Sequence, residues 1–233
     1  MRKVALVTGG NKGIGLEVTR YFLHKDYRVI VIARDFSDFE FSRNTDVEQV
    51  AYDLSDINGI PDLIDNLGKV DVLVNNAGIM LSIPFDLYRQ NDVEYIIKTN
   101  IESPVAMIRE VSKSMIKNKS GRIINNASIA GQIGHPDIWY GITKAGLINA
   151  TKSFSRILGP KGIIINAVAP SPVETNMLNI IPQARKKEFI SSAITGRFAT
   201  ANEIAETIGW LGTTSPIYIN GTCIDINDGS FLR

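Results

Sequence analysis

Short runs of β-branched and apolar residues recur along the chain, and most stretches between them have the spacing of amphipathic helices. Continuous apolar runs of this kind are typical of strands buried on both faces of a sheet. After the first run, Ile14, Val18 and Phe22 fall on one helical face. Alternating strands and helices predict an α/β fold with a doubly wound parallel sheet. The expected strands are 4–7, 28–32, 49–52, 70–74, 122–124, 163–168 and 223–226.

Length and composition favour one compact domain spanning residues 1–233, because no segment is polar or repetitive enough to be a linker. The stretch 35–48 is expected to be a turn or a brief helix. A net charge of +1 indicates no nucleic-acid partner. No apolar stretch approaches the roughly 20 residues that span a bilayer, and no signal peptide precedes the first strand. Cys223 is the only cysteine, which fits a reducing compartment, so we expect a cytoplasmic protein. The low net charge and the short apolar runs predict no membrane partner.

A glycine-rich loop, Thr8 to Gly15, joins the first expected strand to the first helix. Ligands of such sheets bind at the carboxyl ends of the strands. Glycines allow a tight turn beside a pyrophosphate, and the helix start supplies free amides. The loop lacks the Gly-Lys-Ser/Thr ending of nucleotide triphosphatases, which argues against ATP or GTP hydrolysis. The residues expected to bind a dinucleotide here are Gly9, Asn11, Lys12, Gly13, Ile14 and Gly15.

Polar motifs follow the later strands. They are Asp53-Leu54, Asn75-Asn76-Ala77-Gly78, Asn100, Ser128 and Tyr140-Gly141-Ile142-Thr143-Lys144. Together with the TGxxxGxG spacing of the loop, they resemble the short-chain dehydrogenase/reductase family along nearly the whole chain. The resemblance implies a single Rossmann-type dinucleotide-binding catalytic domain and a homotetramer or homodimer. It also implies that the cofactor contacts Asp53, Leu54, Asn76, Ala77 and Gly78.

Tyr140 and Lys144 are four residues apart in a helical segment, so their side chains share a face. A nearby ammonium group is expected to lower the pKa of the tyrosine from its usual value near 10, so that it acts as general acid or base. The resemblance implies that Lys144 also holds the nicotinamide ribose, that Ser128 bonds the substrate carbonyl oxygen and that Asn100 supports a proton relay. Fixed donors around a developing oxyanion favour hydride addition to a carbonyl.

The end of the second strand indicates which dinucleotide is used. NAD enzymes usually place an acid there, but this chain has Ala33 followed by Arg34. Arg34 and Lys12 are expected to pair with the 2′-phosphate of NADP(H). The alternative is that both cations are solvated surface charges and that Asp35 acts as the acid that selects NAD.

The segment after the sixth strand, residues 169–175, resembles the family's PGxxxT motif. The resemblance implies cofactor contacts from Pro170, Val173 and Thr175. Ser171 replaces the usual glycine, which is expected to leave the backbone less free. Beyond it, Met177 and Ile181 are expected to form an apolar cover.

Two further features near the expected pocket have plainer interpretations. The charged run 185–188 is interpreted as a solvated helix face. His135 is expected in a loop at the substrate pocket, and no metal site is predicted.

The substrate is expected to be a small-molecule or acyl-carrier-bound carbonyl compound. In its length and in its Arg197-Phe198 and 227–229 segments, the chain resembles reductases of 3-oxoacyl thioesters on acyl carrier protein. If it is such a reductase, Lys119 and Lys161 are expected to present positive charge to the acidic carrier protein. Two alternatives stay open: a dehydrogenase or reductase of another small alcohol or ketone, such as a sugar, steroid or quinone, and a cofactor-sensing regulator without turnover. Such regulators usually lose the tyrosine or lysine, and both are present here.

Overall fold

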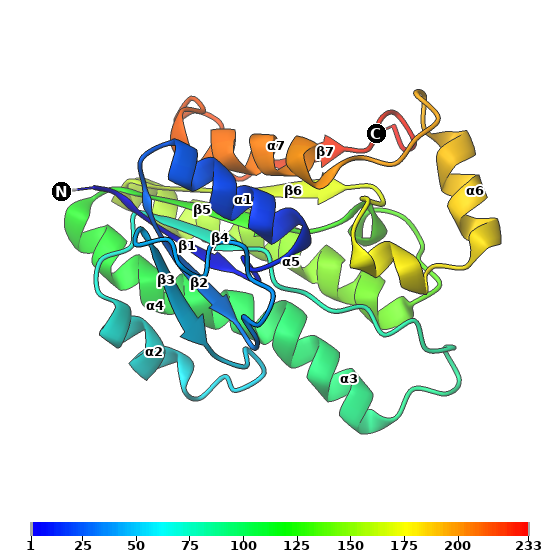
Figure 1. Cartoon of the computed structure of the whole chain (residues 1–233), viewed down its shortest axis with the longest axis horizontal. Coiled ribbons are helices and arrows are strands. Elements are labelled where there is room, and N and C mark those ends of the chain that lie inside the picture. The colour runs from blue at the N-terminus through cyan, green and yellow to red at the C-terminus, as the bar shows by residue number, and fades with distance from the viewer. Residues whose placement is uncertain (1, 233) are drawn as a thin grey trace.

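A seven-stranded parallel sheet is the centre of the computed structural model, which describes residues 2–232 (Figure 1). The strand order is β3-β2-β1-β4-β5-β6-β7, so the chain runs outward from β1 and β4 in opposite directions. The strands are β1 Val4–Thr8, β2 Arg28–Ala33, β3 Val47–Ala51, β4 Val72–Asn75, β5 Gly121–Asn126, β6 Ile163–Pro170 and β7 Cys223–Ile226. The predicted doubly wound sheet in a single domain is confirmed, with a strand at each expected place.

Helices cover both faces of the sheet, because neighbouring residues of a strand point to opposite sides. Val7 and Val31 pack toward α1 and α7, whereas Leu6 and Ile30 pack toward α2, α4 and α5. The helices are α1 Gly13–His24, α2 Ile60–Leu67, α3 Gln90–Ile97, α4 Ser103–Asn118, α5 Ile138–Leu158, α6 Gln183–Ser192 and α7 Ala201–Thr213. Short helical turns lie at η1 Lys98–Glu102, η2 Ile129–Gly131, η3 Gly159–Lys161 and η4 Asn176–Ile180. No helix within residues 2–232 is long and apolar enough to cross a bilayer.

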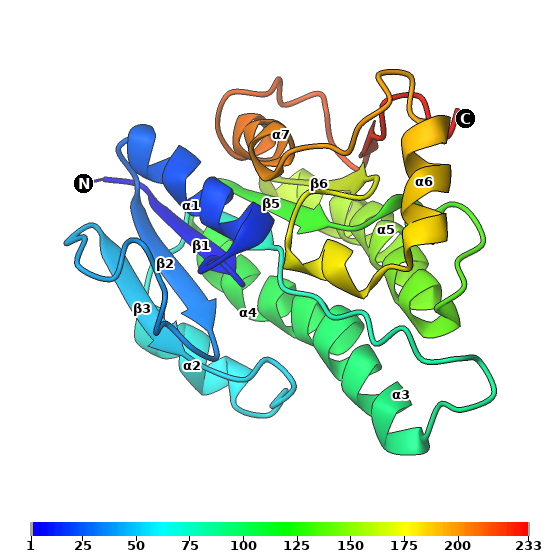
Figure 2. The ribbon, with the colours of Figure 1, turned by 45° about the vertical axis from the view of Figure 1, so that its right-hand side comes forward.

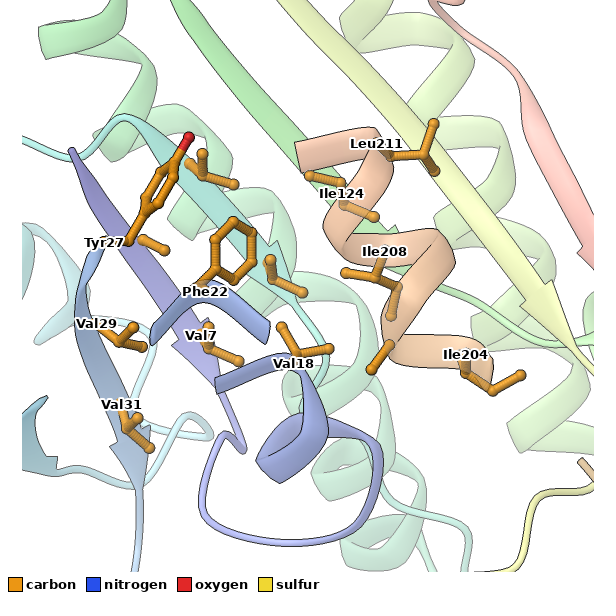
Figure 3. Packing of buried hydrophobic residues seen from close by; sticks show 14 of the residues in the cluster. Val7, Val18, Phe22, Tyr27, Val29, Val31, Ile124, Ile204, Ile208 and Leu211 are labelled. Carbon is orange, nitrogen blue, oxygen red and sulfur yellow. The ribbon is translucent and has the colours of Figure 1, made fainter. Parts of the chain in front are cut away.

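The core between the sheet and α1 fixes the position of that helix (Figure 3). Phe22 is fully buried, and its ring centroid lies 5.2 Å from that of Tyr27. Ile208 of α7 packs into the same cluster, and a Cβ at Gly209 would collide with the ring of Tyr21. Because α1 cannot shift without disturbing this packing, the loop that leads into it is held in place as well.

The stretch between β2 and β3 forms turns and contains no helix, which decides between the two structures expected there. The amide of Phe39 donates to the carbonyl of Phe36 at 3.1 Å, and that of Ser42 donates to Phe39 at 3.1 Å. Phe39 is buried and its ring contacts those of Phe36 and Phe41. The turns therefore depend on aromatic packing. The strand that follows, β3, begins at residue 47 rather than at the predicted residue 49.

Candidate functional site

The carboxyl ends of the central strands border a cavity of about 600 Å³. It lies where the strand order reverses, which is where ligands bind in such sheets. The predicted site residues that line it are Gly9, Asn11, Lys12, Gly13, Ile14, Arg34, Asp53, Leu54, Asn76, Ala77, Gly78, Ser128, Tyr140, Lys144, Pro170, Val173 and Thr175. Two predicted residues, Gly15 and Asn100, lie outside the lining.

The glycine-rich loop makes a close turn at the start of α1. Gly9 has a φ of 63°, in the left-handed region that favours glycine, and a Cβ at Gly15 would collide with the carbonyl oxygen of Gly9. No side chain caps the start of α1 and its first turn contains no acid, so its amides remain available to an anion. A Cβ at Gly13 would lie 3.3 Å from the methyl group of Thr175. The segment after β6 therefore closes over this helix start.

Side-chain hydrogen bonds join the loop to the ends of β4 and β5. The Thr8 hydroxyl accepts from the amides of Asn76 and Ala77, both at 3.0 Å. The Asn76 side chain donates to the carbonyls of Thr8 and Gly9, at 3.0 and 3.2 Å, and accepts from Asn126 at 2.9 Å. The sequence analysis missed Thr8 and Asn126. The signal was present for Asn126, since two asparagines follow an apolar run and only Ala127 separates them from Ser128.

Tyr140 and Lys144 lie on the first turns of α5, and the Lys144 Nζ is 5.6 Å from the centre of the Tyr140 ring. That ammonium donates to the main-chain carbonyl of Asn126 at 2.7 Å. Burial raises the pKa of Tyr140, and a hydrogen bond with Ser128 acts in the opposite direction. Burial also lowers the pKa of Lys144 to about 8. The expected lowering of the tyrosine pKa is therefore wrong as a net effect, and Tyr140 keeps its proton at neutral pH.

Asn100 lies in η1, a turn of π-helix between α3 and α4 that the sequence analysis did not predict. Its side chain accepts from the amide of Ile79 at 2.9 Å and donates to the carbonyl of Ile79 and the hydroxyl of Thr143, at 2.9 and 3.1 Å. A Cβ at Gly78 would lie 3.5 Å from the Asn100 Oδ1 and 3.3 Å from the Lys144 Nζ. Asn100 thus ties the loop after β4 to α5, behind the cavity wall.

Two cations line the cavity as predicted, Arg34 directly after β2 and Lys12 in the glycine-rich loop. Arg34 donates to the phenol oxygen of Tyr95 at 2.7 Å, and Lys12 lines the same part of the cavity. The carboxylate of Asp35 accepts from the amide and hydroxyl of Ser37, both at 2.9 Å, and these bonds lower its pKa. The carboxylate of Asp35 is thus bonded within its own loop, although Asp35 lines the cavity as Arg34 does.

The backbone of Ser171, after β6, does not have a positive φ, so this position does not require glycine. Its amide donates to the carbonyl of Ile226 at 3.0 Å. Val173 forms an isolated bridge with Ala199. The serine therefore fits where glycine was expected, and Pro170, Val173 and Thr175 still reach the cavity.

Asp137 holds the start of α5 against the loop after β4, and the sequence analysis missed it. Its carboxylate is 3% exposed and accepts from the amides of Tyr140, Leu81 and Ser82 and from the hydroxyl of Tyr88, at 3.0, 3.2, 2.9 and 2.6 Å. An aspartate just before an expected helix is the usual signal of such a cap. Asp137 therefore fixes the position of Tyr140 relative to the loop.

The far part of the cavity is lined by His135 and by residues of η4 and α6. Figure 2 shows where α6 lies in the molecule. The His135 ring lies 5.3 Å from that of Tyr140, and burial lowers its pKa. Met177 and Ile181 line the cavity, as expected. Arg185 also lines it and is half-buried, so its interpretation as part of a solvated helix face was wrong, whereas Lys187 is exposed.

Lys119 and Lys161 lie close together but away from the cavity. Lys119 ends α4, Lys161 ends η3, and a Cβ at Gly162 would collide with the carbonyl oxygen of Lys119. Both precede strands of the sheet, so they lie at its amino-terminal edge, opposite the cavity.

Comparison with known proteins places these features in context. Residues 3–186 match the family model described as short chain dehydrogenase. The 3-oxoacyl-[acyl-carrier-protein] reductase FabG of Staphylococcus epidermidis is 32% identical over 100% of both chains. The solved structure of ElxO with NADP bound is similar, with a TM-score of 0.90 and 32% identity over 99% of both chains. That of 4-hydroxyisoleucine dehydrogenase complexed with NADH has a TM-score of 0.92 and 26% identity over 98% of both.

Proposed function

The chain belongs to the short-chain dehydrogenase family and is an NAD(P)-dependent oxidoreductase, and we propose that it reduces a carbonyl group to an alcohol with NADPH. One observation carries this proposal: Ser128, Tyr140 and Lys144 line one cavity together with the glycine-rich loop. We call the part of the cavity lined by that loop, Arg34 and Asp53 the cofactor end. The part lined by His135, η4 and α6 is the substrate end.

The residues at the cofactor end fit a dinucleotide. The uncapped start of α1 suits a pyrophosphate, because its amides and the helix dipole favour negative charge. Lys12 and Arg34 suit the 2′-phosphate of NADPH, while Asp35 is bonded to Ser37. NADP is bound in the solved structure of ElxO, which supports the same choice here.

NADPH supplies a hydride to the carbonyl carbon, and the chain's own residues manage the charge on the oxygen. Tyr140 gives its phenol proton to that oxygen, and the nearby ammonium group of Lys144 favours the phenolate that is left behind. Ser128 donates a hydrogen bond to the same oxygen, and Lys144 holds the cofactor ribose beside Tyr140. Asn100 and Asp137 keep α5 in register with the loop after β4. Asn100 also supports the return of a proton to Tyr140.

For the substrate we propose a 3-oxoacyl thioester, bound to an acyl carrier or to a shorter mimic of its arm. The full-length similarity to the Staphylococcus reductase supports this choice. The test is NADPH consumption, followed by absorbance, with acetoacetyl thioesters and with a panel of sugars, steroids and quinones. Higher kcat/KM for the thioesters supports the proposal, whereas activity confined to the panel refutes this substrate.

We also propose a homotetramer or homodimer. Ile138 and Ile142 lie 46% and 51% exposed on the outer face of α5, next to the turn that holds Tyr140. Burying them against a second copy would remove apolar surface from water. Light scattering at micromolar concentration tests this, and a monomeric mass contradicts it.

A further inference from the structure

A cation at the substrate end has no role in the chemistry derived above. Arg185, in the first turn of α6, lines the same cavity as Tyr140 and His135. Figures 1 and 2 show α6 at the end of the molecule opposite the N-terminus, with η4 between it and the start of α1. The Arg185 guanidinium carbon lies over the Phe189 ring, 5.1 Å from its centre. Such a contact holds the group while leaving its N–H edge available for hydrogen bonds.

No carboxylate pairs with Arg185 in the described part of the chain. Glu188 and Asp137 both influence its pKa, yet neither lies within ion-pair distance of it. The carboxylate of Asp137 is already engaged by four other donors. Arg185 is half-buried, so part of its hydration has been lost, and this burial lowers the pKa of the guanidinium. A desolvated cation without a protein partner is stabilised when an anion binds beside it.

The surroundings of Arg185 distinguish it from the cations at the cofactor end. Lys12 and Arg34 line the cavity together with Asp35, Asp38 and Asp53. At the substrate end the remaining lining is largely apolar: Ile79, Met80, Ile133, Met177, Leu178, Ile181 and Phe189. Apolar walls strengthen the attraction between a guanidinium and an anion.

We propose that Arg185 binds an anionic group of the substrate, a carboxylate or a phosphate ester, attached to the same molecule as the carbonyl oxygen that Tyr140 protonates. This inference rests on the proposed function. Both groups offer two or more oxygens to the donor fork of a guanidinium. A free 3-oxo acid would supply the carboxylate, and the arm of a carrier-type thioester would supply the phosphate.

Two matched pairs of ketones separate these sources. The first is acetoacetate and its methyl ester; the second is acetoacetyl-4′-phosphopantetheine and acetoacetyl-pantetheine. The wild type is expected to favour the anionic member of one pair in kcat/KM, and that pair identifies the source. Arg185→Gln should reduce this preference roughly 10- to 100-fold, the usual effect of losing a charge-assisted hydrogen bond. Arg185→Lys should keep part of it, and Lys187→Gln, an equal change of charge on the same helix, should keep all of it.

A preference that survives Arg185→Gln, or that falls equally with Lys187→Gln, overturns the inference. So does a weakening of NADPH binding by Arg185→Gln that accounts for the whole loss, because the arginine would then serve the cofactor. Calorimetric titration of the NADPH-bound protein with 4′-phosphopantetheine against pantetheine, and with 3-hydroxybutyrate against its methyl ester, needs no turnover. If no ketone is reduced but Arg185 still confers tighter binding of an anionic member, the proposed function fails, and only the anion-binding role of Arg185 stands. Equal binding within both pairs overturns it.

Discussion

At the cofactor end of the cavity, Asn76 donates hydrogen bonds to Thr8 and Gly9 and accepts one from Asn126, and these bonds tie the ends of β1, β4 and β5 to one another. At the substrate end, η4 and α6 contribute no buried residue. The first arrangement fixes backbone positions through short-range motifs, whereas the second depends on where exposed helices come to rest. We therefore expect the bonded strand ends to hold the cofactor and the more exposed helices to select the substrate.

The largest effect is expected where the two ends meet, at Tyr140. Tyr140→Phe should keep the fold and NADPH binding but lower kcat roughly 10²- to 10⁴-fold, the usual weight of a positioned general acid. Tyr218→Phe, at a side chain that is 99% exposed, is the matched control. Stopped-flow turnover and NADPH fluorescence measure the two quantities. A loss of only a few-fold in turnover means that another group donates the proton.

Arg34→Asp tests the cofactor end alone. The ratio of kcat/KM for NADPH to that for NADH should fall roughly 10- to 100-fold, because a cation that meets the 2′-phosphate becomes an acid that repels it. Arg43→Asp, an exposed position in the following turn, should leave the ratio unchanged. If Arg34→Asp leaves the ratio unchanged, Arg34 does not bind the 2′-phosphate, and Asp35 becomes the residue that selects the dinucleotide.

The burial of Lys144 makes stability depend on pH. Its pKa is about 8 in the folded chain, against an ordinary value of 10.5. Between these values the unfolded chain binds more protons, so stability rises as pH rises through this window. From pH 8 to 10 the gain should be up to about 2 kcal/mol. Urea midpoints of the wild type should rise more than those of Lys144→Met, and Lys152→Met, exposed on the same helix, should follow the wild type. Parallel midpoints in all three proteins contradict a buried charge at Lys144.

The smallest effect is expected for Lys119 and Lys161, which lie at the sheet edge opposite both ends of the cavity. Changing both to Glu should raise KM for acetoacetyl-carrier protein by only about two- to five-fold, because exposed charges act mainly on encounter, and added salt should reproduce part of this. KM for a short acetoacetyl thioester should stay the same. An equal rise in KM for both substrates indicates misfolding. If KM rises for neither substrate, these lysines do not contribute to carrier binding.

The same contrast explains what the sequence revealed. Apolar runs and turn motifs are local, so the seven strands, the glycine-rich loop and the Tyr140–Lys144 pair could be predicted from neighbouring residues. The π-turn at Asn100 could not, because bonds to Ile79 and Thr143 accompany it. The sequence indicated that Arg185 is a solvated surface charge. Its place at the cavity could not be predicted, because it depends on the path of the chain after β6, which brings α6 to the cavity.

The contact between Gly13 and Thr175 has a consequence for how the protein is made. The glycine-rich loop leaves the ribosome early. The segment with Thr175 that covers it emerges only after six of the seven strands have been synthesised. Parallel pairing across such long stretches of chain is slow, so the site is completed late in folding. A nascent chain lacking this segment has little to gain from the dinucleotide, since a ligand stabilises only the state that binds it. Cofactor binding therefore favours the finished chain and cannot guide its first half.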